Sequence, residues 1–274
     1  MRPPRPFEAA GTPRLLRRVA GDHVEWWTET VGKMPAVYGE RWASLGERSF
    51  RSFDPSRSKL AAGLARGWDG PLPAPGESWL YLGAASGTTV SHVADLVGPA
   101  GTVFAVEKSP RPFARLVAVA ERWPNLLPLL DDAREPENYL DLVAPVDGIY
   151  ADVAQPDQAG IVLRNAEYFL AEPSGSVVLA LKLPSLGRER GPLVHLRDAE
   201  TRLGAEFALA ASVRLEPFHR GHYLLGGSRT TASRAGRPTS RGPPSRLSRT
   251  TDARDRPGTR LRPRRAWNPG PRRR

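Results

Sequence analysis

In "YLGAASGTTV", residues 81–90, a short apolar segment runs into a small-residue turn and then into a helical pattern, which indicates a βα unit. In such a unit the backbone can approach a ligand at the carboxyl end of the strand. Gly83 and Gly87 are four residues apart, so this is not the dinucleotide motif Gly-x-Gly-x-x-Gly, and no Gly-Lys-Ser/Thr follows as in a phosphate-binding loop. Any tight βα turn also uses glycine, so the turn alone identifies no ligand.

The segments around this turn alternate between strand and helix. The strand segments are almost wholly apolar, which is typical of a parallel sheet covered by helices on both faces. The sequence therefore predicts an α/β, Rossmann-like fold. We expect strands at 78–83, 101–109, 125–133, 146–153, 175–183, 208–218 and 222–227, and helices at 54–68, 88–98, 111–123, 159–170 and 195–206.

Two further regions flank the Rossmann-like domain, which we place at residues 56–227. Residues 1–55 combine aromatic side chains with frequent Gly and Pro, which indicates a small N-terminal β-rich domain. After Gly227 the apolar periodicity stops. Residues 228–274 are therefore predicted to form a disordered tail rich in Arg, Pro and Ser.

The positive charge of the chain belongs to this tail. Residues 228–274 hold 15 Arg and 2 Asp, a net +13, and subtracting it from the chain's +11 leaves −2 for residues 1–227. The tail is a polyanion-binding extension, a solvated appendage or a late frameshift product. The folded body is nearly neutral in each case.

The composition excludes several kinds of chemistry. No cysteine is present, which rules out thiol catalysis, disulfides and cysteine-ligated metals, and the five histidines show no paired metal-binding spacing. We therefore expect no metal. The chain also has no apolar run of membrane-spanning length and no secretory signal, so we expect no membrane partner and a cytoplasmic location.

Acidic residues follow two strands of the pattern. Glu107 ends the second strand, 24 residues after Gly83, where a carboxylate can hold ribose hydroxyls, and Asp132 ends the third. A turn and two strand-end acids without phosphate-binding chemistry favour S-adenosylmethionine over NAD or ATP. The alternative for Glu107 is an ordinary surface glutamate.

A second pair of charges indicates catalysis. Asp152 ends a buried strand, and Lys182 ends the strand at 175–183. Only four of the chain's 40 basic residues are lysines, so a lysine at such a site suggests that a compact, titratable ammonium is required. These strands are neighbours in a Rossmann-like fold, so the two side chains could pair. The alternative is a plain structural ion pair.

Four segments together resemble one known family. "YLGAASGTTVSHVADLVGPAGTVFAVE", "DDAREPENY", "ADVAQPDQ" and "RSKLAAGL" are similar to fibrillarin, the RNA-guided 2′-O-methyltransferase of box C/D ribonucleoprotein particles. The resemblance covers roughly residues 35–226 and is closer to the archaeal form, because a Gly/Arg-rich N-terminal region is lacking. It implies a Rossmann-like, S-adenosylmethionine-dependent methyltransferase domain behind a small β-rich domain.

The resemblance also implies the functional residues. The catalytic set falls on Lys59, Asp152, Lys182 and His222. Gly221 replaces an aspartate that the family has before the histidine, so His219 remains an alternative to His222. The residues implied to bind S-adenosylmethionine are Gly83, Ala84, Ser86, Thr88, Thr89, Glu107, Lys108, Asp132, Ala133, Asp152 and Gln155.

The partners implied by the resemblance are those of a ribonucleoprotein. They are a box C/D guide RNA, target ribosomal and possibly transfer RNA, a Nop-domain scaffold and a kink-turn-binding subunit similar to a ribosomal protein. Residues 20–55 and the helix at 111–123 are candidate docking surfaces. The alternatives are a stand-alone ribosomal RNA methyltransferase of the heat-shock type and a non-catalytic paralogue that binds the particle.

Overall fold

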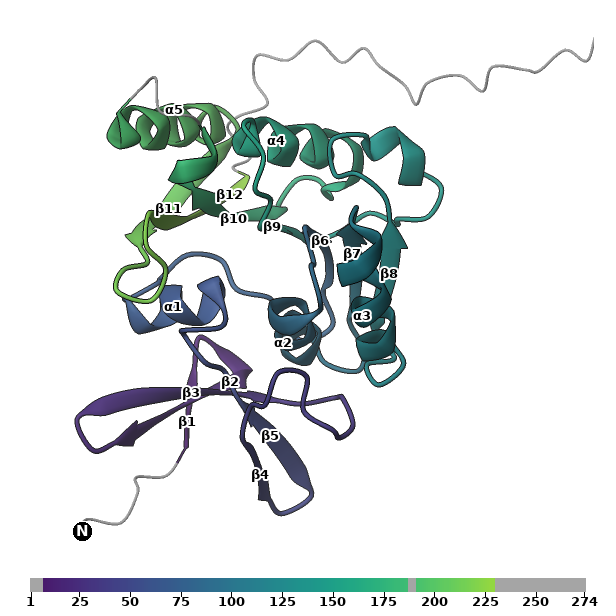
Figure 1. Ribbon diagram of the computed structural model, residues 1–274, viewed down its shortest axis with the longest axis vertical. Coiled ribbons are helices and arrows are strands. Elements are labelled where there is room, and N and C mark those ends of the chain that lie inside the picture. The colour runs from purple at the N-terminus through teal and green to yellow at the C-terminus, as the bar shows by residue number, and fades with distance from the viewer. Residues whose placement is uncertain (1–6, 187–190, 230–274) are drawn as a thin grey trace, which may run out of the picture. The chain divides into compact units, whose positions relative to one another are not determined.

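The computed structural model describes residues 7–186 and 191–229, and most of the predicted tail lies outside the described residues. Within them, seven strands form one sheet in the order β11-β12-β10-β9-β6-β7-β8 (Figure 1). All seven were predicted, with ends that differ by a few residues. Their bounds are β6 Ser78–Leu82, β7 Thr102–Glu107, β8 Leu126–Leu130, β9 Gly148–Ala151, β10 Ser176–Lys182, β11 Phe207–Arg214 and β12 His222–Arg229.

The predicted parallel sheet contains one antiparallel strand. The five strands from β10 to β8 pair in parallel, whereas β12 runs antiparallel to both of its neighbours, β10 and β11. The connection from β11 to β12 spans only residues 215–221. A parallel return needs a crossover of about a dozen residues or more, so this short connection imposes antiparallel pairing.

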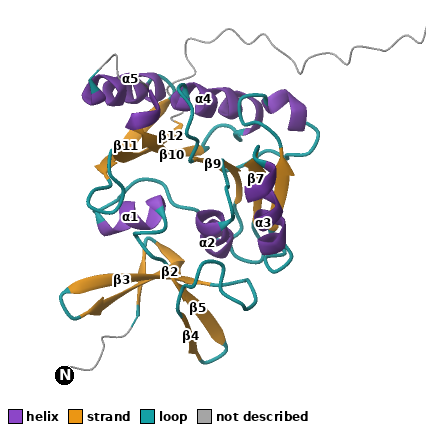
Figure 2. Ribbon diagram, viewed as in Figure 1, coloured by secondary structure: helices purple, strands orange, loops and turns teal. Residues whose placement is uncertain are grey.

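Helices cover both faces of this sheet (Figure 2). One core joins the sheet to α1, α2 and α3, and a second joins the opposite face to α4 and α5. The sequence of β10 is continuously apolar because both faces of this strand are buried. Val178 faces the first core, and Val177 and Leu179 face the second. The helices are α1 Lys59–Ala65, α2 Thr88–Val97, α3 Pro110–Ala120, α4 Gln158–Phe169 and α5 Pro192–Gly204, with short 3-10 turns at Pro136–Tyr139 and Leu183–Leu186.

A second, wholly antiparallel sheet precedes α1, as the sequence predicts for a β-rich N-terminal region. Its order is β1-β2-β3-β5-β4, and its small core contains Leu16, Trp27 and Phe50. The strands are β1 Glu8–Ala10, β2 Thr12–Ala20, β3 His23–Glu29, β4 Trp42–Leu45 and β5 Arg48–Ser52.

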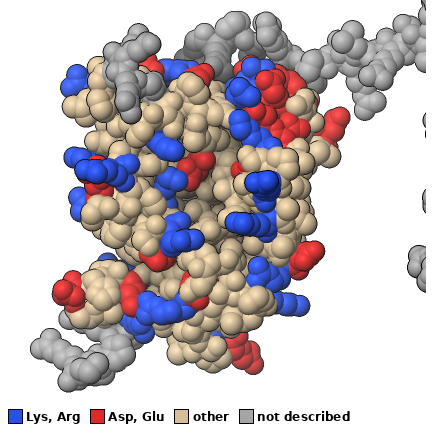
Figure 3. Space-filling view, in the orientation of Figure 1, with Lys and Arg blue, Asp and Glu red and all other residues tan. Residues whose placement is uncertain are grey.

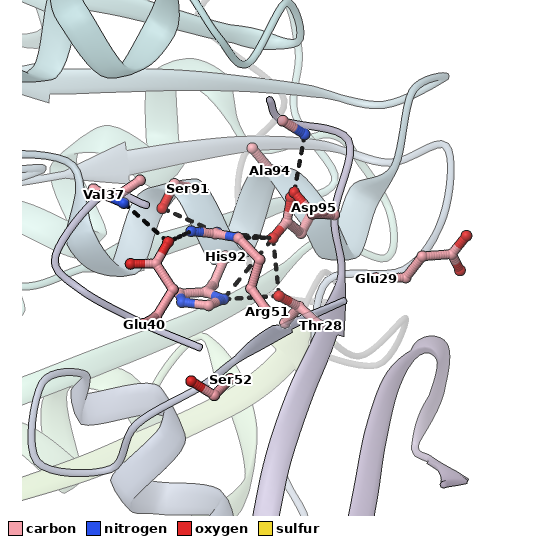
Figure 4. Close-up of polar contacts among 12 residues, drawn as sticks. Thr28, Glu29, Val37, Glu40, Arg51, Ser52, Ser91, His92, Ala94 and Asp95 are labelled. Carbon is pink, nitrogen blue, oxygen red and sulfur yellow. Dashed lines mark hydrogen bonds and ion pairs between the residues drawn. The ribbon is translucent and has the colours of Figure 1, made fainter. Parts of the chain in front are cut away.

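A buried charged cluster attaches this sheet to α2 (Figure 4). The Arg51 guanidinium of β5 lies 2.7 Å from a Glu40 oxygen and 2.8 Å from an Asp95 oxygen, and all three side chains are fully buried. Asp95 also accepts hydrogen bonds from Thr28 and Trp123 at 2.9 and 2.8 Å. Each buried charge therefore has several partners, which is the condition under which a buried ion pair is tolerated.

The predicted domain boundaries at residues 55 and 227 stay predictions, since the described residues fall into one compact unit. Strand β12 nevertheless extends two residues into the predicted tail. Ser228 bonds to Ser176 at 2.8 Å, and the Arg229 guanidinium donates to the Ala166 and Leu170 carbonyls. In the described part of the chain, no helix has the length and apolar character to cross a membrane, and the cytoplasmic location stays a prediction.

Candidate active site

A cleft opens where the parallel strands end. Seven of the eleven residues predicted to bind cofactor line it: Gly83, Glu107, Lys108, Asp132, Ala133, Asp152 and Gln155. The other four predicted residues are not among the described residues that line the cleft. Ala84 is buried, Ser86 lies in the turn after β6, and Thr88 and Thr89 are the first residues of α2. Six lining residues were not predicted as binders: Ala85, Val106, Ser109, Asp131, Val153 and Ala154. Asp131 was the easiest to find, because it immediately precedes Asp132.

The turn after β6 requires glycine at its first position. Gly83 has φ +81°, and a Cβ there would lie 2.5 Å from the Asp152 carbonyl oxygen. A larger residue would push apart the ends of β6 and β9. The glycine therefore brings the turn directly against Asp152, and backbone lines this part of the cleft.

Glu107 is held in one orientation by the backbone. Its carboxylate accepts hydrogen bonds from the Ala85 N–H at 2.9 Å and the Ser109 N–H at 2.7 Å. The side chain thus bridges the turns that follow β6 and β7. An acid fixed in this way presents its remaining lone pairs in a set direction, which suits recognition of a hydroxyl pair.

Asp132, in the same cleft, has a lowered pKa. A hydrogen bond from Arg134, with further help from Lys108, lowers its pKa to about 2. The Arg134 and Lys108 nitrogens lie 2.7 and 3.7 Å from its oxygen. Asp132 is therefore ionised at neutral pH.

Lys59 and Asp152 meet at the edge of the cleft. The Lys59 ammonium donates to an Asp152 oxygen at 2.6 Å, and each side chain is 21% exposed. Lys59 is the first residue of α1, and the Ser58 hydroxyl caps this helix by accepting the Ala61 N–H. The cap fixes where the helix begins and therefore where the ammonium lies.

Asp152 pairs with Lys59, and no ion pair between the described residues Lys182 and Asp152 is formed. Ala151 lies opposite Leu179, so Lys182 extends two residues beyond the level of Asp152, roughly 6–7 Å along the strand. The Lys182 backbone instead exchanges hydrogen bonds with the Gln158 amide, at 2.8 and 3.0 Å. In the antiparallel ladder of β10 and β12, the backbone of Lys182 lies opposite that of His222.

Both candidate histidines lie near the Lys59–Asp152 pair, with ring centroids 6.0 Å apart. Burial, reinforced by the Lys59 charge, lowers the pKa of each ring, so both are neutral at pH 7. His222 Nδ1 lies 2.8 Å from the Arg220 carbonyl, and His219 Nε2 lies 2.9 Å from the Pro55 carbonyl. A carbonyl only accepts, so these nitrogens carry the hydrogens. The free acceptor is Nε2 in His222 and Nδ1 in His219.

Charges of both signs gather on this face of the molecule. Figure 3 shows acidic side chains at a hollow in the surface, with Lys and Arg side chains on either side of it. The four carboxylates of the cleft suit a cationic ligand, and the surrounding basic groups suit a polyanion such as a nucleic acid backbone.

The strand order and the position of the cleft define a Rossmann-like methyltransferase fold. A solved structure of Aeropyrum pernix fibrillarin with natively bound S-adenosylmethionine matches with a TM-score of 0.73 and 35% identity, over 83% of this chain and all of that one. A fibrillarin/Nop5p complex matches with a TM-score of 0.70 and 36% identity, over 80% of this chain and 99% of that one.

Sequence comparison identifies the family. The sequence model of the family "Fibrillarin" matches residues 17–231. A relative from Staphylothermus marinus, named a fibrillarin-like rRNA/tRNA 2′-O-methyltransferase, is 44% identical over 69% of this chain and 81% of its own length. The chain belongs to the fibrillarin family, which confirms the resemblance drawn from the sequence.

Proposed function

We propose that this protein transfers the methyl group of S-adenosylmethionine to a ribose 2′-hydroxyl of ribosomal or transfer RNA, guided by a box C/D RNA. The observation that carries the proposal is the Lys59–Asp152 contact of 2.6 Å at the edge of the cleft. A carboxylate next to an ammonium is suited to a hydroxyl that must lose its proton as it attacks. The relative from Staphylothermus marinus is named a fibrillarin-like rRNA/tRNA 2′-O-methyltransferase, which supports the 2′-O-methylation part of the proposal.

The cleft fits the proposed cofactor in three ways. Gln155 has a buried amide oxygen without a partner among the described residues, and it is available to an amine or hydroxyl donor. Glu107 is pre-oriented for ribose hydroxyls. Gly83 brings the backbone of the turn directly against Asp152, so that backbone lines this part of the cleft. When bound, S-adenosylmethionine supplies a sulfonium methyl group that is already activated toward a nucleophile.

The residues of this chain then have the task of placing and deprotonating the RNA hydroxyl. Asp152 orients the hydroxyl and accepts its proton through an oxygen that Lys59 does not occupy. The Lys59 ammonium stabilises negative charge that develops on the attacking oxygen. His222 offers a neutral Nε2 as an acceptor near this pair. Lys182, which lies beyond Asp152 along the sheet, is proposed to contact the RNA.

The RNA specificity is proposed to come from partners. Residues 1–227 carry a net charge of −2, which favours weak RNA binding by the body alone. A guide RNA selects the target by base pairing, while the protein contacts backbone and 2′-hydroxyls. A Nop-domain scaffold and a kink-turn-binding subunit complete the proposed particle, and the fibrillarin/Nop5p complex supports the first of these.

The experiment that tests the proposal compares methyl transfer to one target RNA under three conditions. The full chain is assayed alone, with scaffold and kink-turn-binding subunit, and with both proteins plus a matching guide RNA. We expect transfer at the guide-specified nucleotide only in the third condition. Equal transfer by the chain alone would favour a stand-alone enzyme, and cofactor binding without transfer in any condition would favour a non-catalytic paralogue.

A further inference from the structure

The loop that precedes α1 determines where Lys59 begins its helix. The Asp54 carbonyl accepts the N–H groups of Arg57 and Ser58, both at 3.0 Å, so the loop forms a tight turn. Ser58 then caps α1, and Lys59 follows directly. A shift of this loop would carry the Lys59 ammonium away from Asp152.

Two side chains from distant parts of the chain anchor this loop. The Thr89 hydroxyl, at the start of α2, donates to the Ser58 hydroxyl at 3.1 Å. His219, in the connection between β11 and β12, donates its Nε2–H to the Pro55 carbonyl at 2.9 Å, across 164 residues of sequence. The loop is therefore held at both ends, at Pro55 by His219 and at Ser58 by Thr89.

The connection that carries His219 is itself well braced. The N–H groups of Phe218 and His219 both donate to the carbonyl of Leu215, at 3.0 and 3.1 Å, and Leu215 is fully buried. The N–H of Gly221 donates to the Glu216 carboxylate at 3.2 Å. His219 thus extends from a closed loop whose base is fixed in the core.

We infer that His219 is a positioning residue that ties the β11–β12 connection to the loop before α1 and so holds Lys59 against Asp152. The inference rests on the proposed function, because it assigns His219 a purpose in that reaction. Each ring keeps one acceptor nitrogen, so the two histidines differ in what their N–H groups hold. The N–H of His222 reaches the Arg220 carbonyl two residues away, whereas that of His219 reaches the loop before α1.

The chemistry of the side chain fits this purpose. A neutral imidazole donates to the Pro55 carbonyl without adding a positive charge next to the Lys59 ammonium. Lysine or arginine at this position would repel Lys59 and compete with it for Asp152. Glutamine keeps one N–H donor at a similar distance and remains neutral, whereas leucine keeps the bulk but cannot donate.

The test compares His219→Leu with His219→Gln in the full chain. The amine reactivity of Lys59 toward an acylating reagent is measured by mass spectrometry, with exposed Lys33 as the internal reference. Methyl transfer is measured in the assembled particle. We expect His219→Leu to raise Lys59 reactivity severalfold and to lower kcat by about 10- to 100-fold, with the KM for S-adenosylmethionine nearly unchanged. His219→Gln should retain most of the wild-type reactivity and rate.

Two results would overturn the inference. An unchanged Lys59 reactivity in His219→Leu would mean that the hydrogen bond from His219 to Pro55 is not required to hold the loop in place. An equal loss of kcat in both variants would mean that the ring itself takes part in the reaction. Asp152→Asn is assayed in parallel, because its retention of activity would refute the proposed catalytic set while leaving the reactivity measurement of Lys59 as a separate test of the tie.

Discussion

The cluster around Arg51 and the pair of Lys59 with Asp152 both join a basic group to a carboxylate, but in opposite settings. Arg51 and Asp95 have no exposed side-chain surface, whereas Lys59 and Asp152 are each 21% exposed. Asp95 accepts from four described residues, whereas the Asp152 carboxylate accepts one described hydrogen bond. The charges that hold the fold together are fully satisfied. The charges proposed to act on RNA keep spare hydrogen-bonding capacity for a ligand.

The largest predicted effect on stability comes from breaking the buried cluster. Arg51→Leu leaves the carboxylates of Glu40 and Asp95 buried without their main partner, and we expect a loss of about 3–5 kcal/mol in the free energy of unfolding. Denaturant titration measures this loss.

Arg48→Leu is the matched control for this prediction. Arg48 also pairs with a glutamate, Glu29, but its side chain is 51% exposed. Its loss should change stability by less than about 1 kcal/mol. Similar losses in both variants would contradict the distinction between buried and exposed pairs.

For Lys59→Met we expect a large loss of methyl transfer and little change in stability, the reverse of Arg51→Leu. This change removes the ammonium next to Asp152, and we expect methyl transfer in the assembled particle to fall by about 10²–10³-fold. The free energy of unfolding should change by about 1 kcal/mol or less, because the pair is partly solvated. Lys33→Met removes an exposed lysine and should leave both quantities unchanged. Loss of stability without loss of rate would make Lys59 a structural residue.

A smaller effect concerns acid stability. Burial and the nearby Arg51 charge lower the pKa of His92 well below 6.5, so the unfolded chain binds a proton that the folded chain excludes. Stability from this group is complete above pH 6.5 and declines as the pH falls below it, by up to about 1.4 kcal/mol per pH unit.

The measurement is unfolding of the wild type and His92→Gln between pH 7.5 and about 5.5. His92 lies 2.8 Å from both the Thr28 and Tyr38 hydroxyls, and glutamine keeps polar atoms there but does not titrate. The variant should therefore show a shallower dependence on pH. An equal pH dependence of the unfolding free energy in both proteins would show that His92 does not cause the loss of stability in acid.

The features that could be predicted from sequence are those with a local signal. The apolar run of β10, with side chains buried on both faces, predicts a central strand. The strand-end positions of Glu107 and Asp152 place both in one cleft, because the carboxyl ends of parallel strands meet at one edge. The ion-pair partner of Asp152 has no such signal: the strand-end positions allow a pair with Lys182, but the structure pairs Asp152 with Lys59.

Contacts between segments that are distant in the sequence could not be predicted either. The tie from His219 to Pro55 joins residues that nothing in the local sequence relates. Arg51 and Asp95 resemble surface charges in sequence, and only the packing of the N-terminal sheet on α2 buries them. The antiparallel direction of β12 follows from the short connection that precedes it, and this length can be read in the sequence.

The charge of Asp152 is proposed to serve methyl transfer and not the fold. The most direct measurement is the single-turnover rate of methyl transfer in the assembled particle for the wild type and Asp152→Asn, together with the free energy of unfolding of both chains. We predict a rate lower by about 10²–10⁴-fold and a stability within about 1 kcal/mol of the wild type. A near-wild-type rate, or a loss of stability comparable to that of Arg51→Leu, would contradict the claim.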